Sequence, residues 1–182
     1  AQGVYPLAYY PHNYHFLAAT ATLEGKKSWA LTASEKMSEH IDRDLMKDPA
    51  WATLQHYYLI PYFVLVKFGD WDSILSRPEP AIDLPYVQAI RHYATGMAYL
   101  NQKNIPAARE ALTRLDSIKR DTTLKELTIW AINSIADIVS IAAKVLQAEI
   151  LAVESSFDQS IQLLREAVAL EDQLAYNEPP DW

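Results

Sequence analysis

Apolar residues recur every three or four positions along most of the 182-residue chain, the spacing typical of amphipathic helices. Glycine and proline residues divide this pattern into segments. The pattern predicts helices over residues 11–24, 28–41, 48–68, 71–76, 85–100 and 104–119, then a helix or helix pair over 124–153 and a last helix reaching 176. The proline-rich segment 77–84 is expected to be a loop, and the tail 177–182 contains prolines that exclude a helix.

Local residues mark the expected helix ends. Gly25 and Gly69 follow helical segments, and glycine adopts the left-handed conformation that ends a helix. Asp48 followed by Pro49 is typical of a helix start. The run Ser156-Phe-Asp-Gln159 has the form of a capping box. The chain is therefore expected to be all-α, with short turns between helices.

The turns indicate a repeated helix hairpin. The first helix of each hairpin is expected to end at Gly25, Gly69, Lys103 and Ser156, spaced by 44, 34 and 53 residues. Five residues after each turn lie Ala30, Ile74, Ala108 and Ile161, and each is expected to face the preceding helix. The middle spacing equals the period of the tetratricopeptide repeat.

The third hairpin carries the most specific residues. Gly96, Tyr99, Ala108, Leu112 and Leu115 have the order of small, aromatic and large apolar residues that this repeat needs, and here the chain resembles a tetratricopeptide repeat protein. The resemblance implies a right-handed superhelix of antiparallel helix hairpins, in one domain with units at 5–45, 48–80, 83–120 and 124–176. The small residue supplied by Gly96 is kept by Ala18, while Tyr62 and Glu149 take its place in the other units.

Two further segments, 5–17 and 178–182, resemble stretches of a bacterial subfamily of long tetratricopeptide proteins. That resemblance implies that the chain is an internal or C-terminal piece of a longer protein, and it implies no activity.

The composition of the chain argues against several classes of function. A net charge of -7 argues against nucleic-acid binding and against a basic membrane-surface helix, and no apolar run reaches membrane-spanning length. The lack of cysteine excludes disulfides and thiolate zinc sites and fits either the cytoplasm or a periplasm. Glycine-rich phosphate loops, Gly-x-Ser-x-Gly and His-Glu-x-x-His are all missing. We expect neither an enzyme nor a cofactor.

The resemblance also implies which residues form a binding groove, because the first helix of each tetratricopeptide hairpin lines the concave face. Counting back from each turn places His12 in line with His56, and His15 in line with Leu59 and Tyr93. One turn further along, Phe63 aligns with Met97. An aromatic and apolar groove with polar groups at one end suits a peptide or a partner helix. The expected function is a protein–protein interaction scaffold that binds a peptide or partner protein in this groove.

Other interpretations stay open. His12 and His15 lie on one helix face and His56 could approach them, so three imidazoles could bind zinc, copper or nickel. The same histidines could instead be hydrogen-bonded residues between repeats. A further alternative is an architectural segment of a larger enzyme or assembly. Exposed repeat ends, at Tyr5–Phe16 or on the last helix, are expected to favour self-association.

Overall fold

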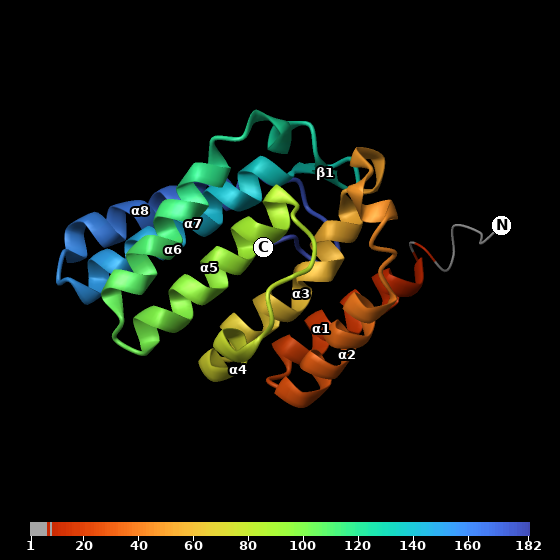
Figure 1. Ribbon diagram of the computed structural model, residues 1–182, viewed down its shortest axis with the longest axis horizontal. Helices are drawn as coiled ribbons and strands as arrows, with labels where there is room; N and C mark the ends of the chain where they lie inside the picture. The colour runs from red at the N-terminus through yellow and green to blue at the C-terminus, as the bar shows by residue number, and fades with distance from the viewer. Residues whose placement is uncertain (1–6, 8) are drawn as a thin grey trace.

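Helices form most of the described part of the chain, residues 7 and 9–182, in the computed structural model (Figure 1). The eight α-helices described are α1 (Tyr10–Leu23), α2 (Lys27–His40), α3 (Thr53–Lys67), α4 (Trp71–Ser76), α5 (Pro85–Asn101), α6 (Ile105–Lys119), α7 (Ile135–Val153) and α8 (Phe157–Glu171). Three short 3₁₀ turns are η2 (Leu45–Lys47), η3 (Pro49–Trp51) and η4 (Thr122–Lys125). The all-α expectation is confirmed.

The helices pack against their neighbours in a regular order. Antiparallel partners α1 and α2, α3 and α4, α5 and α6, and α7 and α8 contact each other. The first members of these pairs also contact in series, α1 with α3, α3 with α5 and α5 with α7. Figure 1 shows the resulting row of helices, with α1 and α2 at one end and α7 and α8 at the other.

The same type of hydrogen-bonded turn follows each of four helices, α1, α3, α5 and α7. Each turn has a residue with positive φ, at Gly25 (72°), Gly69 (65°), Lys103 (60°) and Ser155 (63°). The next residue donates its N–H to a carbonyl five positions back, in the pairs Lys26–Ala21, Asp70–Leu65, Asn104–Tyr99 and Ser156–Leu151. These bonds satisfy carbonyl groups that a helix end would leave unpaired. The same turn therefore sets the start of each second helix.

The fourth turn corrects the sequence alignment by one residue. Its left-handed residue is Ser155 and not Ser156. Five residues later the chain therefore buries Ser160, whereas Ile161 is 48% exposed, so the expectation that Ile161 faces the preceding helix is wrong. The shift also places the buried Ala148, rather than Glu149, at the position equivalent to Gly96. The fourth hairpin thus keeps a small residue at this position.

Gly96 allows close packing between α5 and α7. A Cβ atom on Gly96 would lie 2.6 Å from Leu146 Cδ2 and 2.9 Å from its Cδ1. Leu146 is fully buried, so its side chain has little room to move away. The contact between α5 and α7, the first helix of the next hairpin, therefore requires glycine at position 96.

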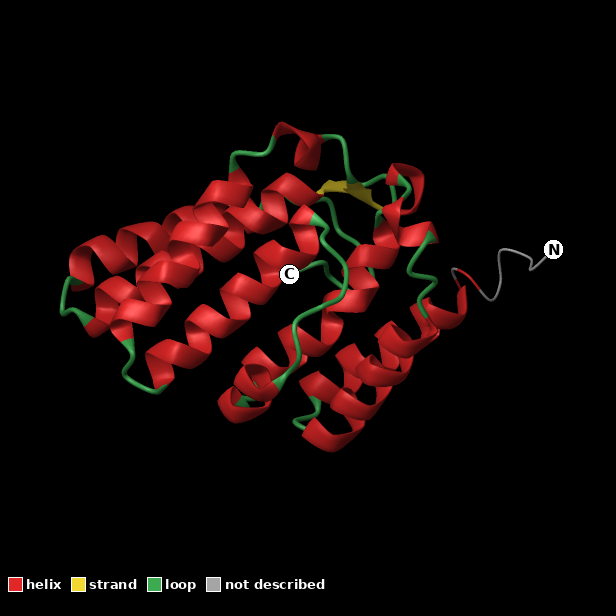
Figure 2. Ribbon diagram, in the orientation of Figure 1, coloured by secondary structure: helices red, strands yellow, loops and turns green. Residues whose placement is uncertain are grey.

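The segment 124–153 differs most from its expected helical structure. It begins with η4 and continues into a two-stranded antiparallel hairpin, β1 (Thr128–Ile129) and β2 (Asn133–Ser134), before α7 starts at Ile135 (Figure 2). Trp130 and Ala131 both have positive φ, at 53° and 57°, and the Ile132 N–H donates to the Ile129 carbonyl. Positive φ at two consecutive turn residues is typical of a type I′ turn, which usually contains Asn or Gly. The absence of those residues explains why the sequence did not indicate a hairpin.

Three other helix limits also differ from the expectations. The predicted helix 48–68 is divided, because Asp48 caps η3 by accepting the Ala50 N–H and α3 begins only at Thr53. Ser156 makes no side-chain cap hydrogen bond, so the capping box does not form. The last helix ends at Glu171, and the chain beyond it continues in turns and loops.

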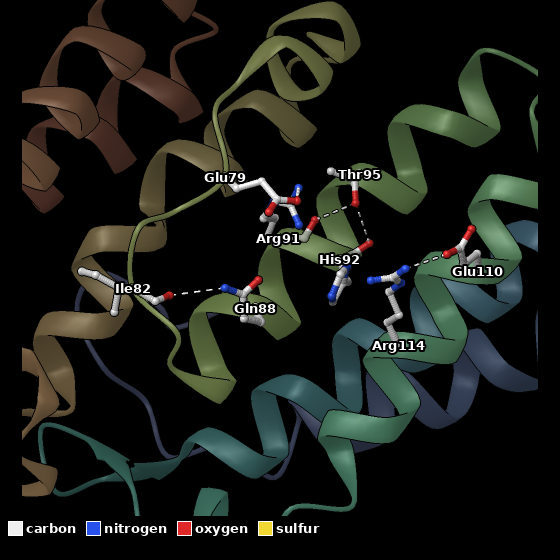
Figure 3. Close-up of polar contacts among 8 residues, drawn as sticks. All are labelled: Glu79, Ile82, Gln88, Arg91, His92, Thr95, Glu110 and Arg114. Carbon is white, nitrogen blue, oxygen red and sulfur yellow. Dashed lines mark hydrogen bonds and ion pairs between the residues drawn. The ribbon is translucent and has the colours of Figure 1, made fainter.

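The proline-rich loop 77–84 is held against the helices by polar contacts (Figure 3). Arg91 Nη2 on α5 lies 2.6 Å from a Glu79 carboxylate oxygen, and Gln88 Nε2 donates to the Ile82 carbonyl at 3.3 Å. His92 lies half-buried on α5 beside Arg114 of α6 (Figure 3). Burial, helped by Arg91 and Arg114, lowers the pKa of His92 to about 4. Its ring is therefore neutral near pH 7 and lies at the interface of this hairpin.

The Gly96 contact gives a test of the packing between hairpins. Gly96→Ala is expected to lower the free energy of unfolding by about 1 kcal/mol, because overpacking costs roughly 1–3 kcal/mol and the gain in helix propensity is about 1 kcal/mol. In a Leu146→Ala background the same substitution is expected to be stabilising, since the clash is gone. Urea unfolding of the four proteins measures both effects. An equal effect of Gly96→Ala in both backgrounds would show that Leu146 does not set the constraint.

Candidate functional site

The C-terminal tail, residues 175–182, turns back from α8 and ends against the first helices of the middle hairpins. Figure 1 shows the chain end between α3 and α5. The Trp182 ring centroid lies 5.6 Å from that of Phe63 on α3 and 5.3 Å from that of Tyr93 on α5. Trp182 thus packs on two residues that the sequence analysis predicts to line a binding groove.

Asn133 on β2 holds the tail through three hydrogen bonds. Its Nδ2 donates to the Ala175 carbonyl at 2.9 Å and to Asp181 Oδ2 at 2.7 Å, and its Oδ1 accepts the Ala175 N–H at 2.8 Å. Asp181 Oδ1 also accepts a bond from Asn177 Nδ2 at 3.1 Å. Asp181 is only 5% exposed. A buried carboxylate needs such donors, because an unpaired one would be costly to remove from water.

A pocket of about 470 Å³ remains open beside the tail. We call its helical wall the inner groove, formed by His15, Ala18, Ala19, Thr22 and Leu23 on α1, Ile60, Phe63, Val64, Val66 and Lys67 on α3, Tyr93 on α5 and Val145 on α7. The tail supplies the opposite wall with Pro179, Pro180, Asp181 and Trp182. Most of these side chains are apolar. The pocket can therefore take an apolar group and offers few polar partners.

Two histidines and two tyrosines form a polar cluster below the pocket. The rings of His15 and His56 lie 5.7 Å apart, and His15 lies 5.4 Å from the Tyr57 ring. His56 Nδ1 lies 2.9 Å from the Tyr86 hydroxyl, and both residues are fully buried. The buried Nε2 of His56 has no hydrogen-bond partner among the described residues.

Burial keeps these histidines neutral. It lowers the pKa of His56 to about 4, against an opposing effect of the Asp181 charge. Burial also lowers the pKa of His15 well below its ordinary value, with smaller contributions from His56 and His12. Near pH 7 the cluster therefore contributes hydrogen-bonding groups and no positive charge.

The structure divides the expected groove residues into three groups. His15, Phe63 and Tyr93 line the pocket together. His56 and Leu59 lie beneath the surface, with exposures of 1% and 0%, and present nothing to a partner in this arrangement. Met97 is half-buried against the core and outside the pocket lining.

His12 lies at the edge of the cluster. Its Nδ1 is 3.2 Å from the Tyr57 hydroxyl, and its ring is 5.7 Å from the Trp130 ring. Within residues 7 and 9–182, no three His, Cys, Asp or Glu side chains are grouped so that they could hold a metal ion. His12, His15 and His56 therefore share a neighbourhood without forming a three-ligand site.

Sequence reasoning missed the residues that complete the site. Asn133, Asp181 and Trp182 lie outside the helical periodicity, and Asn133 is 42 residues from the Ala175 backbone that it binds. The only local signal was a tail that combines prolines with a terminal aromatic residue. Tyr5, at the start of the proposed self-association surface, lies outside the described residues, whereas Phe16 is exposed.

Comparisons of the chain with protein-family models, with curated proteins and with solved structures found no match. In the part of the chain that the structure describes, no helix has both the length and the apolar character needed to cross a membrane.

Removing the Asn133 amide should release the tail. Asn133→Ala leaves the Asp181 carboxylate and the Ala175 backbone without these partners, so we expect a loss of about 1–3 kcal/mol in unfolding free energy. Hydrogen exchange at residues 175–182 should become faster, while the core helices keep their protection. Asn101→Ala, at an exposed position on α5, is the matched control. Unchanged tail exchange in Asn133→Ala would refute this anchoring role.

The buried histidines predict a loss of stability in acid. The folded-state pKa of His56 lies below the unfolded value of 6.5, so its contribution is fully present above pH 6.5 and is lost as the pH falls towards about 4. One such group accounts for about 3 kcal/mol across this range. Chemical unfolding at pH 7 and pH 4.5 should show a smaller pH effect in His56→Gln than in the parent chain. The exposed His40→Gln is the control, and an equal pH effect in all three proteins would contradict the assignment.

Proposed function

We propose that the chain is a protein-interaction scaffold of the tetratricopeptide type, a right-handed superhelix that binds a peptide or helix of a partner protein in the inner groove. The pocket of about 470 Å³ between the groove and the tail carries this proposal. Its size falls in the range of about 300–1,000 Å³ common for ligand sites.

The arrangement of helices supports the repeat assignment. Contacts run in series along α1, α3, α5 and α7, and the four hairpin turns share the same hydrogen bonds. Stacked helix hairpins of this kind form an extended surface on which several first helices contribute side chains. The pocket lining follows this pattern, since it draws residues from all four first helices.

The chemistry of the pocket favours a partner with an apolar anchor. Ala19, Ile60 and Val66 supply aliphatic walls, and Phe63 adds an aromatic one. The exposed Lys67 and the neutral His15 are available as polar handles at the edge and floor. Peptide-binding grooves commonly use this combination, in which apolar burial gives affinity and a few polar groups fix the orientation.

Selection of displayed peptides on the purified protein tests this function. Selected peptides should bind the parent chain and lose at least about tenfold in affinity for Ala19→Trp, which fills the pocket, and for Val66→Asp, which places a charge in it. Trp29→Asp on α2, where the tryptophan is 62% exposed away from the pocket, should bind like the parent. Circular dichroism establishes that each variant is folded. Failure to select any peptide, or equal binding by all folded variants, would reject the proposal.

A further inference from the structure

The tail is a non-helical segment that side-chain contacts hold against the groove. Asn133 binds a carboxylate of the tail, and Phe63 and Tyr93 bind an aromatic ring. Pro179 of the tail is also buried. The docked tail therefore shows which contacts the groove makes with one peptide sequence.

These contacts recognise particular chemical groups in a fixed order. The Asn133 amide donates to an acidic side chain, and this site is buried, so a residue without an acceptor would leave one N–H of the amide unpaired. The next residue is a large aromatic whose ring packs against those of Phe63 and Tyr93, a contact that a small side chain would lose. Two prolines before the acid restrict the backbone dihedral angles of the segment, which lowers the entropy lost on binding.

The contacts are made by side chains that do not depend on covalent connection to the tail. Asn133 belongs to β2, and Phe63 and Tyr93 belong to α3 and α5. A segment from another chain could make each of them. The open pocket lies next to the tail, so such a segment could also place an apolar anchor where the tail places none.

We propose that the inner groove, together with Asn133 on β2, recognises partner segments of the form Pro-Pro-acid-aromatic, and that residues 179–182 are an internal copy of this ligand, which a partner must replace. The inference rests on the proposed function of the groove and specifies the chemistry of its partner. A tethered segment competes at an effective concentration of about millimolar, so a partner needs the additional contact in the open pocket to displace it.

A peptide offered in trans tests the inference. The probe is a fluorescently labelled Leu-Ala-Tyr-Asn-Glu-Pro-Pro-Asp-Trp, the sequence of residues 174–182. Trp182→Ala in the full chain weakens the internal copy, and Asp181→Ala is a second variant that does so through the other contact. Fluorescence anisotropy should show binding to both variants and at least about tenfold weaker binding to the parent chain, whose tail competes.

Matched controls locate the binding. Peptides with Trp changed to Ala or Asp changed to Ala should bind at least about tenfold more weakly. Adding Asn133→Ala to Trp182→Ala should abolish binding, whereas adding Trp29→Ala should leave it unchanged. No binding to a folded Trp182→Ala protein would overturn the inference, as would binding that is equal in the parent and insensitive to Asn133→Ala. If display-selected peptides still lose affinity for Ala19→Trp and Val66→Asp, that result would support peptide binding in the groove even though this more specific inference had failed.

Discussion

The left-handed turn residue at the end of each first helix is the constraint on which the site depends. It fixes where the second helix begins, and so which face of each helix meets its neighbour. A shift of one position rotates a helix by about 100°. In the fourth hairpin, this difference separates a buried Ser160 from an exposed Ile161. Because these turns fix the orientations of α1, α3 and α5, His15 and Tyr93 line one pocket with Phe63, which lies one helical turn further along than the aligned Leu59.

The hairpin before α7 connects this helical frame to the tail. Trp130 and Ala131 adopt a left-handed backbone that costs L-residues roughly 1–2 kcal/mol each. The Trp130 N–H donates to Thr53 Oγ1 at 2.8 Å, and the centroid of the Trp130 ring lies 6.1 Å from that of the Tyr57 ring on α3. These contacts offset the strain and hold β2 beside the groove. Asn133 can then bind the tail, so a strained turn positions a distant part of the site.

Sequence predicted the features that depend on local chemistry. Gly25 and Gly69 marked two turns because glycine is the residue best suited to positive φ. His15, Phe63 and Tyr93 were among the groove residues expected from counting back from the turns, and these three line the pocket. Ser155 and Trp130 adopt positive φ without any such marker, so their turns were misplaced or missed. The docking of the tail could not be predicted, because it depends on the spatial meeting of Asn133 and Asp181 rather than on periodicity.

The polar groups of the site also determine how firmly the tail is held. Asp181 is bound by the amides of Asn133 and Asn177, and the nearby His56 is kept neutral by burial. Neutral donors compensate the desolvation of a carboxylate less strongly than a paired cation with the same geometry would. The net free energy of docking is therefore a small difference between aromatic packing, these hydrogen bonds and the cost of dehydrating the acid. A segment held by such a balance can open locally while the helices stay folded, which is the physical requirement for exchange with an equivalent segment of a partner.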